Sequence, residues 1–305
     1  MKTIKINGYN NYPIAGYIWD NVDNPTGVVQ IIHGMQEHAK RYDHFARYLN
    51  TQGLIVFASD LRGHGQTAIE NNAPFGYSDG DIFQEILQDQ IIITDMLKEK
   101  YQLPISIFAH SFGSFIGQRY MIENGFKIKN IILCGSTYTN SATYKFGKFM
   151  STLTCAFGGK KKTAKLIEKF GLNRYGNKFT NGNWLSRDEN NWYKYTHDPL
   201  CGMPFPNNFY RSLFKNATQN YKNLKNIPYY LPILVISGTD DPVTEKNGSV
   251  KLFFTYGKAN KRVYFKTYMN ARHELLNEIN NKDIYKDVSE FIIRNKMDYL
   301  AIAVE

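Results

Sequence analysis

Short runs of β-branched and aromatic residues alternate with helical patterns along the first half of the chain. Each run is bounded by turn residues and is predicted to be a buried strand. The runs lie at residues 28–33, 54–59, 105–109 and 131–134. Between them, apolar residues recur at helical spacing, as in residues 45–53 and 82–97. Because strands that alternate with helices pair with right-handed crossovers, the sequence predicts an α/β fold with a mostly parallel central sheet flanked by helices.

The alternation stops after Cys134 and resumes near residue 233. Two further strand patterns, at residues 233–237 and 262–266, are followed by a last helix whose apolar positions between 284 and 292 share one face. The interval is rich in glycine, proline and polar residues, so short helices and loops are expected there. The predicted division is a core of residues 1–137 and 229–305 and an inserted helical cap, or lid, of residues 138–228.

The formal net charge of +10 is concentrated in the predicted cap. Residues 138–228 hold twelve Lys and three Arg against two Asp and two Glu, a local excess of +11. The same segment contains Phe146, Phe149, Phe157, Trp184 and Trp192 and the run of Lys160, Lys161 and Lys162. Basic residues beside apolar ones are typical of a surface that makes transient contact with an anionic membrane; an ordinary solvated surface is the alternative. No nucleic-acid-binding motif accompanies the charge, so nucleic acid is not expected as a partner.

Two further features concern the compartment. The start of the chain is polar, lacks the apolar stretch of a secretory signal, and is followed by no run of about 18 apolar residues. The three cysteines, Cys134, Cys155 and Cys201, follow no metal or redox spacing. We therefore expect a cytoplasmic protein with reduced thiols. Its basic cap would bring the protein to the inner surface of the membrane.

A predicted strand runs directly into a helix at Ser111. Ala109 and Gly113 lie two positions before and after it. This is the nucleophile-elbow pattern G-x-S-x-G with Ala109 in place of the first glycine. The strained turn requires small residues at both positions, because backbone and helix come too close for larger side chains. Ser111 is therefore the candidate nucleophile; the alternative is that it only caps the following helix.

Only one of the seven histidines, His273, follows the last predicted strand. A loop there, at the carboxyl edge of the sheet, can hold the ring against Ser111, which makes His273 the candidate general base. Its acid is expected after the preceding strand, where Asp240 and Asp241 are adjacent. We favour Asp241, which lies three residues after Gly238 and before a proline that fixes φ. Asp240 stays open as the alternative.

Acyl transfer also needs two backbone N–H donors for the oxyanion. The residue after the nucleophile, Phe112, supplies the first, and a loop after an early strand supplies the second. That loop is predicted at residues 33–35, where Gly34 permits the sharp turn that aims the Met35 amide at the site. Gly34 and Gly113 are thus the turn and elbow glycines. No metal-ligand spacing remains outside these residues, so neither a metal nor a cofactor is expected.

Together these segments resemble the monoacylglycerol lipase and bacterial lysophospholipase branch of the α/β-hydrolases, which is grouped with serine-aminopeptidase-like hydrolases. The matching segments cover nearly the whole chain and lie at residues 33–38, 59–65, 109–114, 238–243 and 272–274. The resemblance implies an α/β-hydrolase fold whose inserted helical cap shapes an acyl pocket. It also implies that Ser111, Asp241 and His273 form a catalytic triad and that the amides of Met35 and Phe112 form the oxyanion hole.

Five charged or histidine residues recur near the site in this family and are expected to be scaffold. They are Glu37, His38, Asp60, Arg62 and His64. We expect Arg62 to pair with Glu37 or Asp60 and so to pin two loops together.

The leading functional prediction is hydrolysis of a lipid ester, a monoacylglycerol or a lysophospholipid, through a covalent acyl-enzyme. A general carboxylesterase is the first alternative. A peptidase that releases N-terminal residues is the second, but it would need acidic cap residues to bind the substrate ammonium group, and the cap has four acidic residues against fifteen basic ones. A ligand-binding protein with a vestigial triad is the non-enzymatic alternative, which the complete set of triad residues disfavours.

Overall fold

A single mixed sheet organises the computed structural model, which describes residues 1–171, 173–244, 247–259 and 262–295. Its strands are β1 (Lys2–Asn7), β2 (Pro13–Trp19), β3 (Gly27–Ile32), β4 (Leu54–Ser59), β5 (Ile105–His110), β6 (Asn130–Cys134), β7 (Ile233–Gly238) and β8 (Val263–Tyr268). They lie in the order β1-β2-β4-β3-β5-β6-β7-β8. The pairs β1/β2 and β2/β4 are antiparallel, and the pairs from β4 onward are parallel.

The six strands predicted from the sequence are confirmed as β3 to β8, with ends that differ by no more than two residues. The strands β1 and β2 have no predicted counterpart. Strand β1 is largely exposed at the edge of the sheet, so its sequence is mostly polar. Strand β2 has Gly16 at its centre, where an added Cβ would lie 3.0 Å from the ring of Phe57. The glycine makes room for that ring on β4 but weakens the strand signal.

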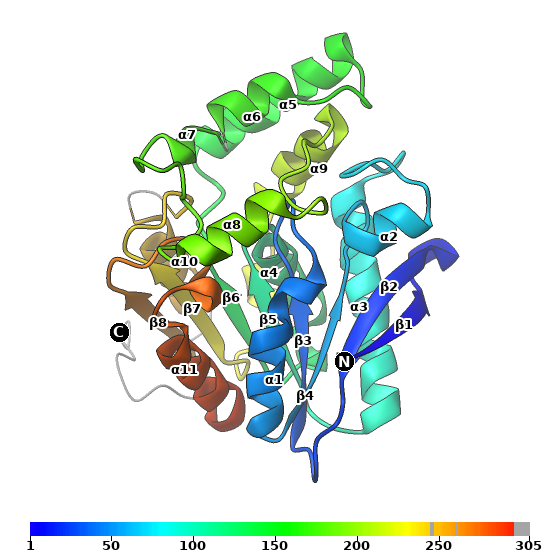
Figure 1. Ribbon diagram of the computed structural model, residues 1–305, viewed down its shortest axis with the longest axis vertical. Coiled ribbons are helices and arrows are strands. Elements are labelled where there is room, and N and C mark those ends of the chain that lie inside the picture. Colours follow the sequence, from blue (N-terminus) through cyan, green and yellow to red (C-terminus); the bar gives the residue numbers. More distant parts are fainter. Residues whose placement is uncertain (172, 245–246, 260–261, 296–305) are drawn as a thin grey trace.

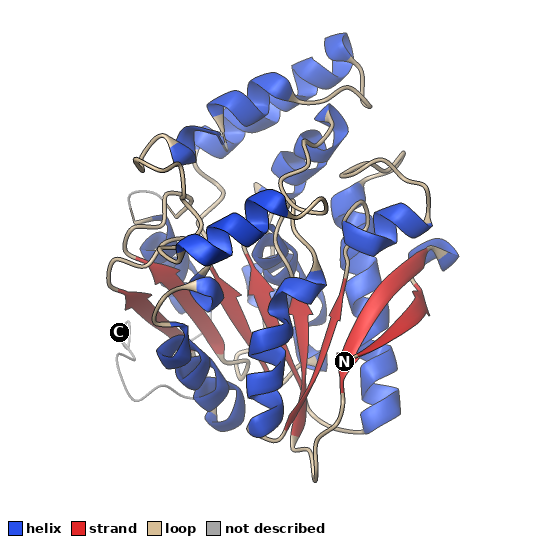
Figure 2. Cartoon of the chain, in the orientation of Figure 1, coloured by secondary structure: helices blue, strands red, loops and turns tan. Residues whose placement is uncertain are grey.

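Helices cover both faces of the sheet, as Figures 1 and 2 show. The helices are α1 (Asp43–Thr51), α2 (Gly65–Glu70), α3 (Ile82–Tyr101), α4 (Phe112–Asn124), α5 (Ala142–Gly158), α6 (Lys165–Phe170), α7 (Asn173–Gly176), α8 (Glu189–His197), α9 (Asn207–Ala217), α10 (Gly248–Ala259) and α11 (Asn281–Arg294). Helices α1 and α11 bury residues such as Phe45 and Val288 on one face, while α3, α4 and α10 bury Leu97, Ile116 and Phe253 on the other. None of the described helices combines the length and apolarity needed to cross a membrane.

Residues 138–228, which we call the cap, contribute helices α5 to α9 between β6 and β7. Figure 1 shows these helices gathered beyond one end of the sheet. The described part of the cap adds no strand to the sheet, in line with the expected helices and loops, although α5 is a long helix of 17 residues. The boundaries of the cap at residues 138 and 228 stay a prediction.

Two carboxylates, one buried and one partly buried, attach the cap to the core. Glu278, which is fully buried, accepts hydrogen bonds from the Arg187 side chain of the cap at 2.8 Å and from the Arg272 backbone of the core at 2.7 Å. At a second point, Asp81 before α3 accepts a bond from Asn216 of α9 at 2.8 Å. Glu278 thus bonds the cap and the histidine loop at once, and Asp81 of the core bonds α9, so these contacts fix where the cap lies over the sheet.

Candidate active site

The turn between β5 and α4 has the strained backbone that a nucleophile elbow requires. Ser111 has φ +50° and ψ −119°, a conformation unusual for a residue with a side chain. An added Cβ at Gly113 would lie 2.3 Å from the Ile32 carbonyl oxygen, so only glycine fits there. Ala109 packs against Gly117, where a Cβ would come within 3.0 Å of it. The glycine one turn into α4 thus provides the space that lets alanine replace the first glycine of the motif.

The hydroxyl of Ser111 faces His273 and does not cap α4. Ser111 precedes α4 but makes no side-chain capping bond to it. Its Oγ lies 2.7 Å from His273 Nε2. This geometry contradicts the alternative that Ser111 serves only as a helix cap.

The other ring nitrogen of His273 contacts Asp241. Nδ1 lies 3.0 Å from Oδ2 and 3.1 Å from Oδ1 of this buried carboxylate. Asp240 is exposed, and its carboxylate accepts a bond from Thr239 instead. Of the two adjacent aspartates, the structure brings Asp241 to the histidine. Gly238 allows this approach, because a Cβ there would lie 1.9 Å from the Ala271 carbonyl oxygen in the histidine loop.

The loop that follows β3 approaches Ser111 from a third side. An added Cβ at Gly34 would lie 3.2 Å from Ser111 Cβ. The buried ring of His33 holds the loop, since Nδ1 lies 2.8 Å from the Gly34 carbonyl oxygen while Nε2 accepts a bond of 3.0 Å from the Leu61 amide. Met35 follows in this loop and Phe112 begins α4. Their amides lie in the two segments expected to form the oxyanion hole, and that role stays a prediction.

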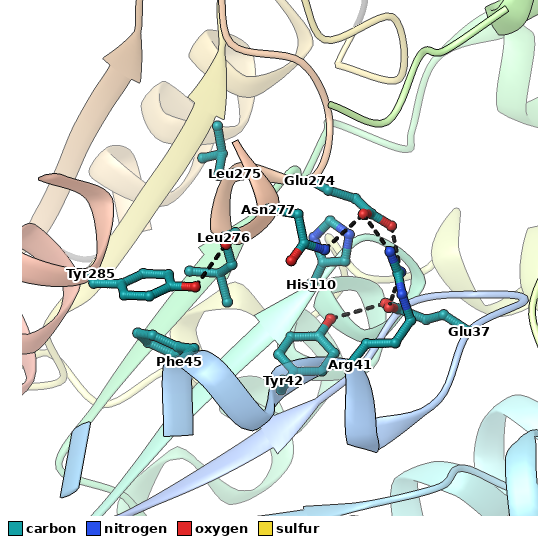
Figure 3. A pocket seen from close by; sticks show the side chains of 10 residues that line it. All are labelled: Glu37, Arg41, Tyr42, Phe45, His110, Glu274, Leu275, Leu276, Asn277 and Tyr285. Carbon is teal, nitrogen blue, oxygen red and sulfur yellow. Dashed lines mark hydrogen bonds and ion pairs between the residues drawn. The ribbon is translucent and has the colours of Figure 1, made fainter. Parts of the chain in front are cut away.

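A buried charged network lies beside the histidine, and Figure 3 shows it around a small cavity. Arg41 donates to Glu274 through both terminal nitrogens, at 2.6 and 2.7 Å, and to Glu37 at 2.7 Å. Glu37 in turn accepts bonds from Tyr42 at 2.9 Å and from the Gly34 amide at 2.6 Å. Arg41 therefore links the loop that carries Gly34 to the residue after His273.

The expectation that Arg62 pairs with Glu37 or Asp60, and so pins the loops at residues 33–38 and 59–65 together, is wrong. Arg62 donates to Asp89 of α3 at 2.5 and 2.9 Å and stacks on Tyr12 at 4.2 Å. Asp60 instead accepts bonds from Tyr17, Ala39 and Gln66. The physical reason is that α3 places the buried carboxylate of Asp89 next to Arg62. Glu37 is bonded instead by Arg41, which lies four residues after it on the helical turn that follows the loop after β3. The loops at residues 33–38 and 59–65 are joined instead by the bond from the Leu61 amide to His33, and the arginine that binds Glu37 is Arg41.

His273 and His110 have adjacent rings, but their surroundings shift their pKa values in opposite directions. Burial opposes protonation of His273, but the adjacent Asp241 carboxylate, with Glu274 and Glu37 farther away, more than offsets it and raises the pKa of His273. Burial and the nearby His273 lower the pKa of His110, whose ring centre is 4.9 Å from that of His273, to about 4. His110 is therefore neutral wherever His273 titrates.

One group of side chains with metal-binding chemistry lies close together in the described residues. The donor atoms of His38, Asp198 and Cys201 are all within 4.8 Å of one another. His38 Nε2 and Asp198 Oδ2 are already paired at 2.8 Å, and the Arg41 guanidinium lies near enough to lower the pKa of Asp198 together with His38. Since this pair is satisfied and a neighbouring cation opposes a dication, we assign no metal or cofactor to it. All three cysteines are buried, and none is in a disulfide.

Three residues near His273 were missed by the sequence reasoning. They are Arg41, Glu278 and Trp184, whose indole lies 5.3 Å from the His273 ring, measured between ring centres. Arg41 lies four residues after Glu37, the spacing of an ion pair on one helical turn, which is the one local signal available. Nothing in the sequence near Trp184 or Glu278 indicates a contact with the histidine loop.

The chain is similar to a family of hydrolases and to several known lipases and esterases. A family model described as serine aminopeptidase, S33, matches residues 23–280. A monoglyceride lipase homolog of Monkeypox virus is 25% identical over 93% of this chain and 95% of its own, and the monoglyceride lipase of Mus musculus is 25% identical over 90% and 84%. The crystal structure of a thermostable carboxyl esterase from Bacillus coagulans in complex with glycerol is similar, with a TM-score of 0.82, 26% identity and 96% of each chain covered.

We expect Asp241→Asn to reduce ester turnover by about 10⁴-fold, because an asparagine holds the imidazole in the wrong tautomer. Asp240→Asn is the matched control: it removes a neighbouring carboxylate that does not contact His273, and it should cost far less. Steady-state kinetics on both purified variants checks the ranking. A larger loss for Asp240→Asn would move the acid to that residue.

We expect turnover to rise with pH through the ionisation of His273, because the imidazole must be neutral to accept the Ser111 proton. Since the pKa of His273 lies above its ordinary value of 6.5, the rise should be centred above that pH. A pH profile of kcat/KM checks this, and His110→Asn should keep the ionisation because His110 is already neutral there. A flat profile between about pH 5 and pH 8, with chemistry limiting, would contradict a histidine base.

Proposed function

The chain belongs to the serine aminopeptidase S33 family of α/β-hydrolases, and from this premise we propose that it hydrolyses carboxylic esters with Ser111 as nucleophile, His273 as general base and Asp241 as the orienting acid. The observation that carries the proposal is the continuous chain of contacts from Ser111 Oγ to His273 Nε2 at 2.7 Å and from His273 Nδ1 to Asp241 at 3.0 Å. The same three roles occur in serine hydrolases of unrelated folds, where geometry identifies them.

The proposed reaction has two halves. Ser111 Oγ attacks the ester carbonyl carbon and transfers its proton to His273 Nε2, while the backbone amides of Met35 and Phe112 stabilise the oxyanion. The carbon–oxygen bond to the alcohol then breaks, and His273 returns the proton to the departing alkoxide. A water molecule, deprotonated by His273, then attacks the acyl-enzyme carbonyl carbon. The bond from this carbon to Ser111 Oγ breaks, the imidazolium returns its proton to Oγ, and the carboxylic acid leaves. Throughout, the Asp241 carboxylate stabilises the imidazolium and stays ionised.

We infer that the acyl group comes from a monoacylglycerol or a lysophospholipid. The monoglyceride lipases to which the chain is similar support a lipid ester. The core behind the elbow is also aromatic: Phe112 lies 5.0 Å from Phe209, which lies 4.6 Å from Phe205, all fully buried. A general carboxylesterase is the second candidate, favoured by the similarity to the Bacillus coagulans esterase.

An aminopeptidase is less well supported by the charges. Such an enzyme binds the ammonium group of its substrate with a carboxylate that has no other partner. In the described residues, Glu168 already accepts bonds from Phe205 and Tyr210, and Asp198 pairs with His38. Glu37 and Glu274 are both paired with Arg41. The carboxylates nearest the site are thus occupied.

We also propose that the outer face of the cap makes transient contact with an anionic membrane. On α5, exposed Phe146 and Phe149 alternate with exposed Lys145 and Lys148. Farther along the cap, Phe157 and Leu166 are exposed as well. The acidic residue among these helices, Glu168, bonds inward, so the exposed charge of this face is positive. Apolar rings between lysines suit a surface of lipid headgroups, where each basic residue contributes about 1 kcal/mol.

The function is tested by activity against short acyl esters, monoacylglycerols and lysophospholipids at equal concentration, compared between the parent and Ser111→Ala. We expect the parent to prefer a lipid ester and Ser111→Ala to lose both hydrolysis and covalent labelling by a fluorophosphonate probe. His273→Ala should lose comparable activity, because members of a triad act as a unit. Substantial turnover by Ser111→Ala would show that another residue is the nucleophile.

For the membrane contact, we expect Lys145→Ser with Lys148→Ser to weaken binding to vesicles of mixed anionic and neutral lipid, and the difference should shrink as salt rises. The exposed pair Lys98 and Lys100 at the end of α3 is the matched control, since Lys98→Ser with Lys100→Ser removes the same charge far from the cap. Hydrolysis of a small soluble ester should be unchanged by either double variant. Equal vesicle binding by both double variants would favour an ordinary solvated surface. The Lys160–Lys162 run is less suitable as a probe because Lys161 stacks on Tyr77 at 5.2 Å.

A further inference from the structure

We propose that Trp184 of the cap is a positioning residue for the catalytic base, and that its indole ring stabilises the imidazolium form of His273 during ester hydrolysis. The inference rests on the function proposed above. The centre of its ring lies 5.3 Å from that of His273, and the two planes are inclined by 30°. The two planes are thus closer to parallel than to perpendicular, and the ring centres lie within the roughly 6 Å at which an aromatic ring attracts a cation.

The backbone on both sides of Trp184 is bonded to the residues on both sides of His273. The Glu274 amide donates to the Leu185 carbonyl oxygen at 2.7 Å. The Arg272 guanidinium donates to the Asn183 carbonyl oxygen. The residues that flank the indole are therefore tied to the residues that flank the imidazole. This pairing fixes the position of Trp184 relative to His273 more firmly than a ring contact alone would.

Two further contacts keep this arrangement rigid. The Asn183 side-chain oxygen accepts bonds from the Leu185 and Ser186 amides, at 3.2 and 3.1 Å, which sets the turn that carries Trp184. Glu278 then holds Arg187 of the cap and the Arg272 backbone with one carboxylate. Because the turn and the histidine loop share these buried partners, Trp184 belongs to the part of the cap that is fixed to the core.

The indole face adds to the charged groups that already favour the imidazolium form of His273. Asp241 contacts Nδ1, while Glu274 and Glu37 also favour the imidazolium from the adjoining loops. Arg41 pairs with both glutamates and offsets only part of their charge, and neutral His110 lies beside the ring. The indole adds attraction for positive charge without adding a proton acceptor that could compete with Ser111. Tyr175, 5.4 Å from Trp184 between ring centres, packs against the indole in turn.

The kinetic test compares Trp184→Leu and Trp184→Phe with the matched control Trp192→Leu. Trp192 is also a cap tryptophan, but its ring contact is with Tyr195, at 6.1 Å. We expect Trp184→Leu to lower kcat for a soluble ester about two- to thirtyfold, the range that a cation–π contact spans, with little change in KM. The midpoint of its pH–rate profile should move to lower pH. Trp184→Phe, which keeps an aromatic face, should retain most of the parent kcat and a midpoint near that of the parent. Trp192→Leu should change neither kcat nor the midpoint.

A second test reads the contact without catalysis. The chain has three tryptophans, so Trp19→Phe with Trp192→Phe leaves Trp184 as the sole indole. A protonated imidazole quenches an adjacent excited indole, so the emission of this variant should fall as His273 is protonated, and His273→Ala should abolish that pH dependence. If ester hydrolysis is absent but the titration is present, the proposed function fails and the contact stands. Emission that does not follow His273, or a pH profile unchanged in a folded Trp184→Leu, would overturn the inference.

Discussion

The site depends on loops that approach one another more closely than side chains would allow. A parallel sheet brings the carboxyl ends of β3, β5, β7 and β8 to one edge, but it leaves their loops a side chain apart. At Gly113 a Cβ would lie 2.3 Å from the backbone of Ile32, and at Gly238 it would lie 1.9 Å from the backbone of Ala271. Glycine at these two positions removes the obstruction. The elbow can then touch the loop after β3, and the acid loop can touch the histidine loop.

The parts of the site that follow a strand could be predicted from the sequence. Ser111, Asp241 and His273 each follow a recognisable strand pattern, so their order along the chain implied a common edge of the sheet. The choice of Asp241 over Asp240 rested on the turn that follows Gly238, and the structure directs only Asp241 toward the ring. The strands β3 to β7 were predictable because each is an apolar run buried on both faces, whereas β8 lies at the edge of the sheet and is only partly buried.

The supporting contacts could not be predicted in this way. Arg62 and Arg41 both lie near acidic residues in the sequence, and the choice between them depended on Asp89, which α3 brings from 27 positions away. The contact of Trp184 with His273 crosses from the cap to the core and follows no periodic pattern. Such contacts are decided by how separate elements pack, and a one-dimensional pattern carries no signal for them.

The cap is strongly basic, yet it lies over a site in which a positive charge on His273 is to be stabilised. The two are compatible because the acidic and basic side chains of the cap lie on different sides of it. The acids Glu168 and Asp198 turn inward, where they bond Tyr210 and His38, and Asp188 caps α8. The lysines of α5 point outward. Water and salt screen exposed charges far more than buried ones, so the outer lysines act weakly on His273 while Asp241 acts strongly. The outer lysines can therefore vary with little effect on His273, whereas Asp198 is constrained by its bond to His38 of the core and Glu168 by its bond to Tyr210.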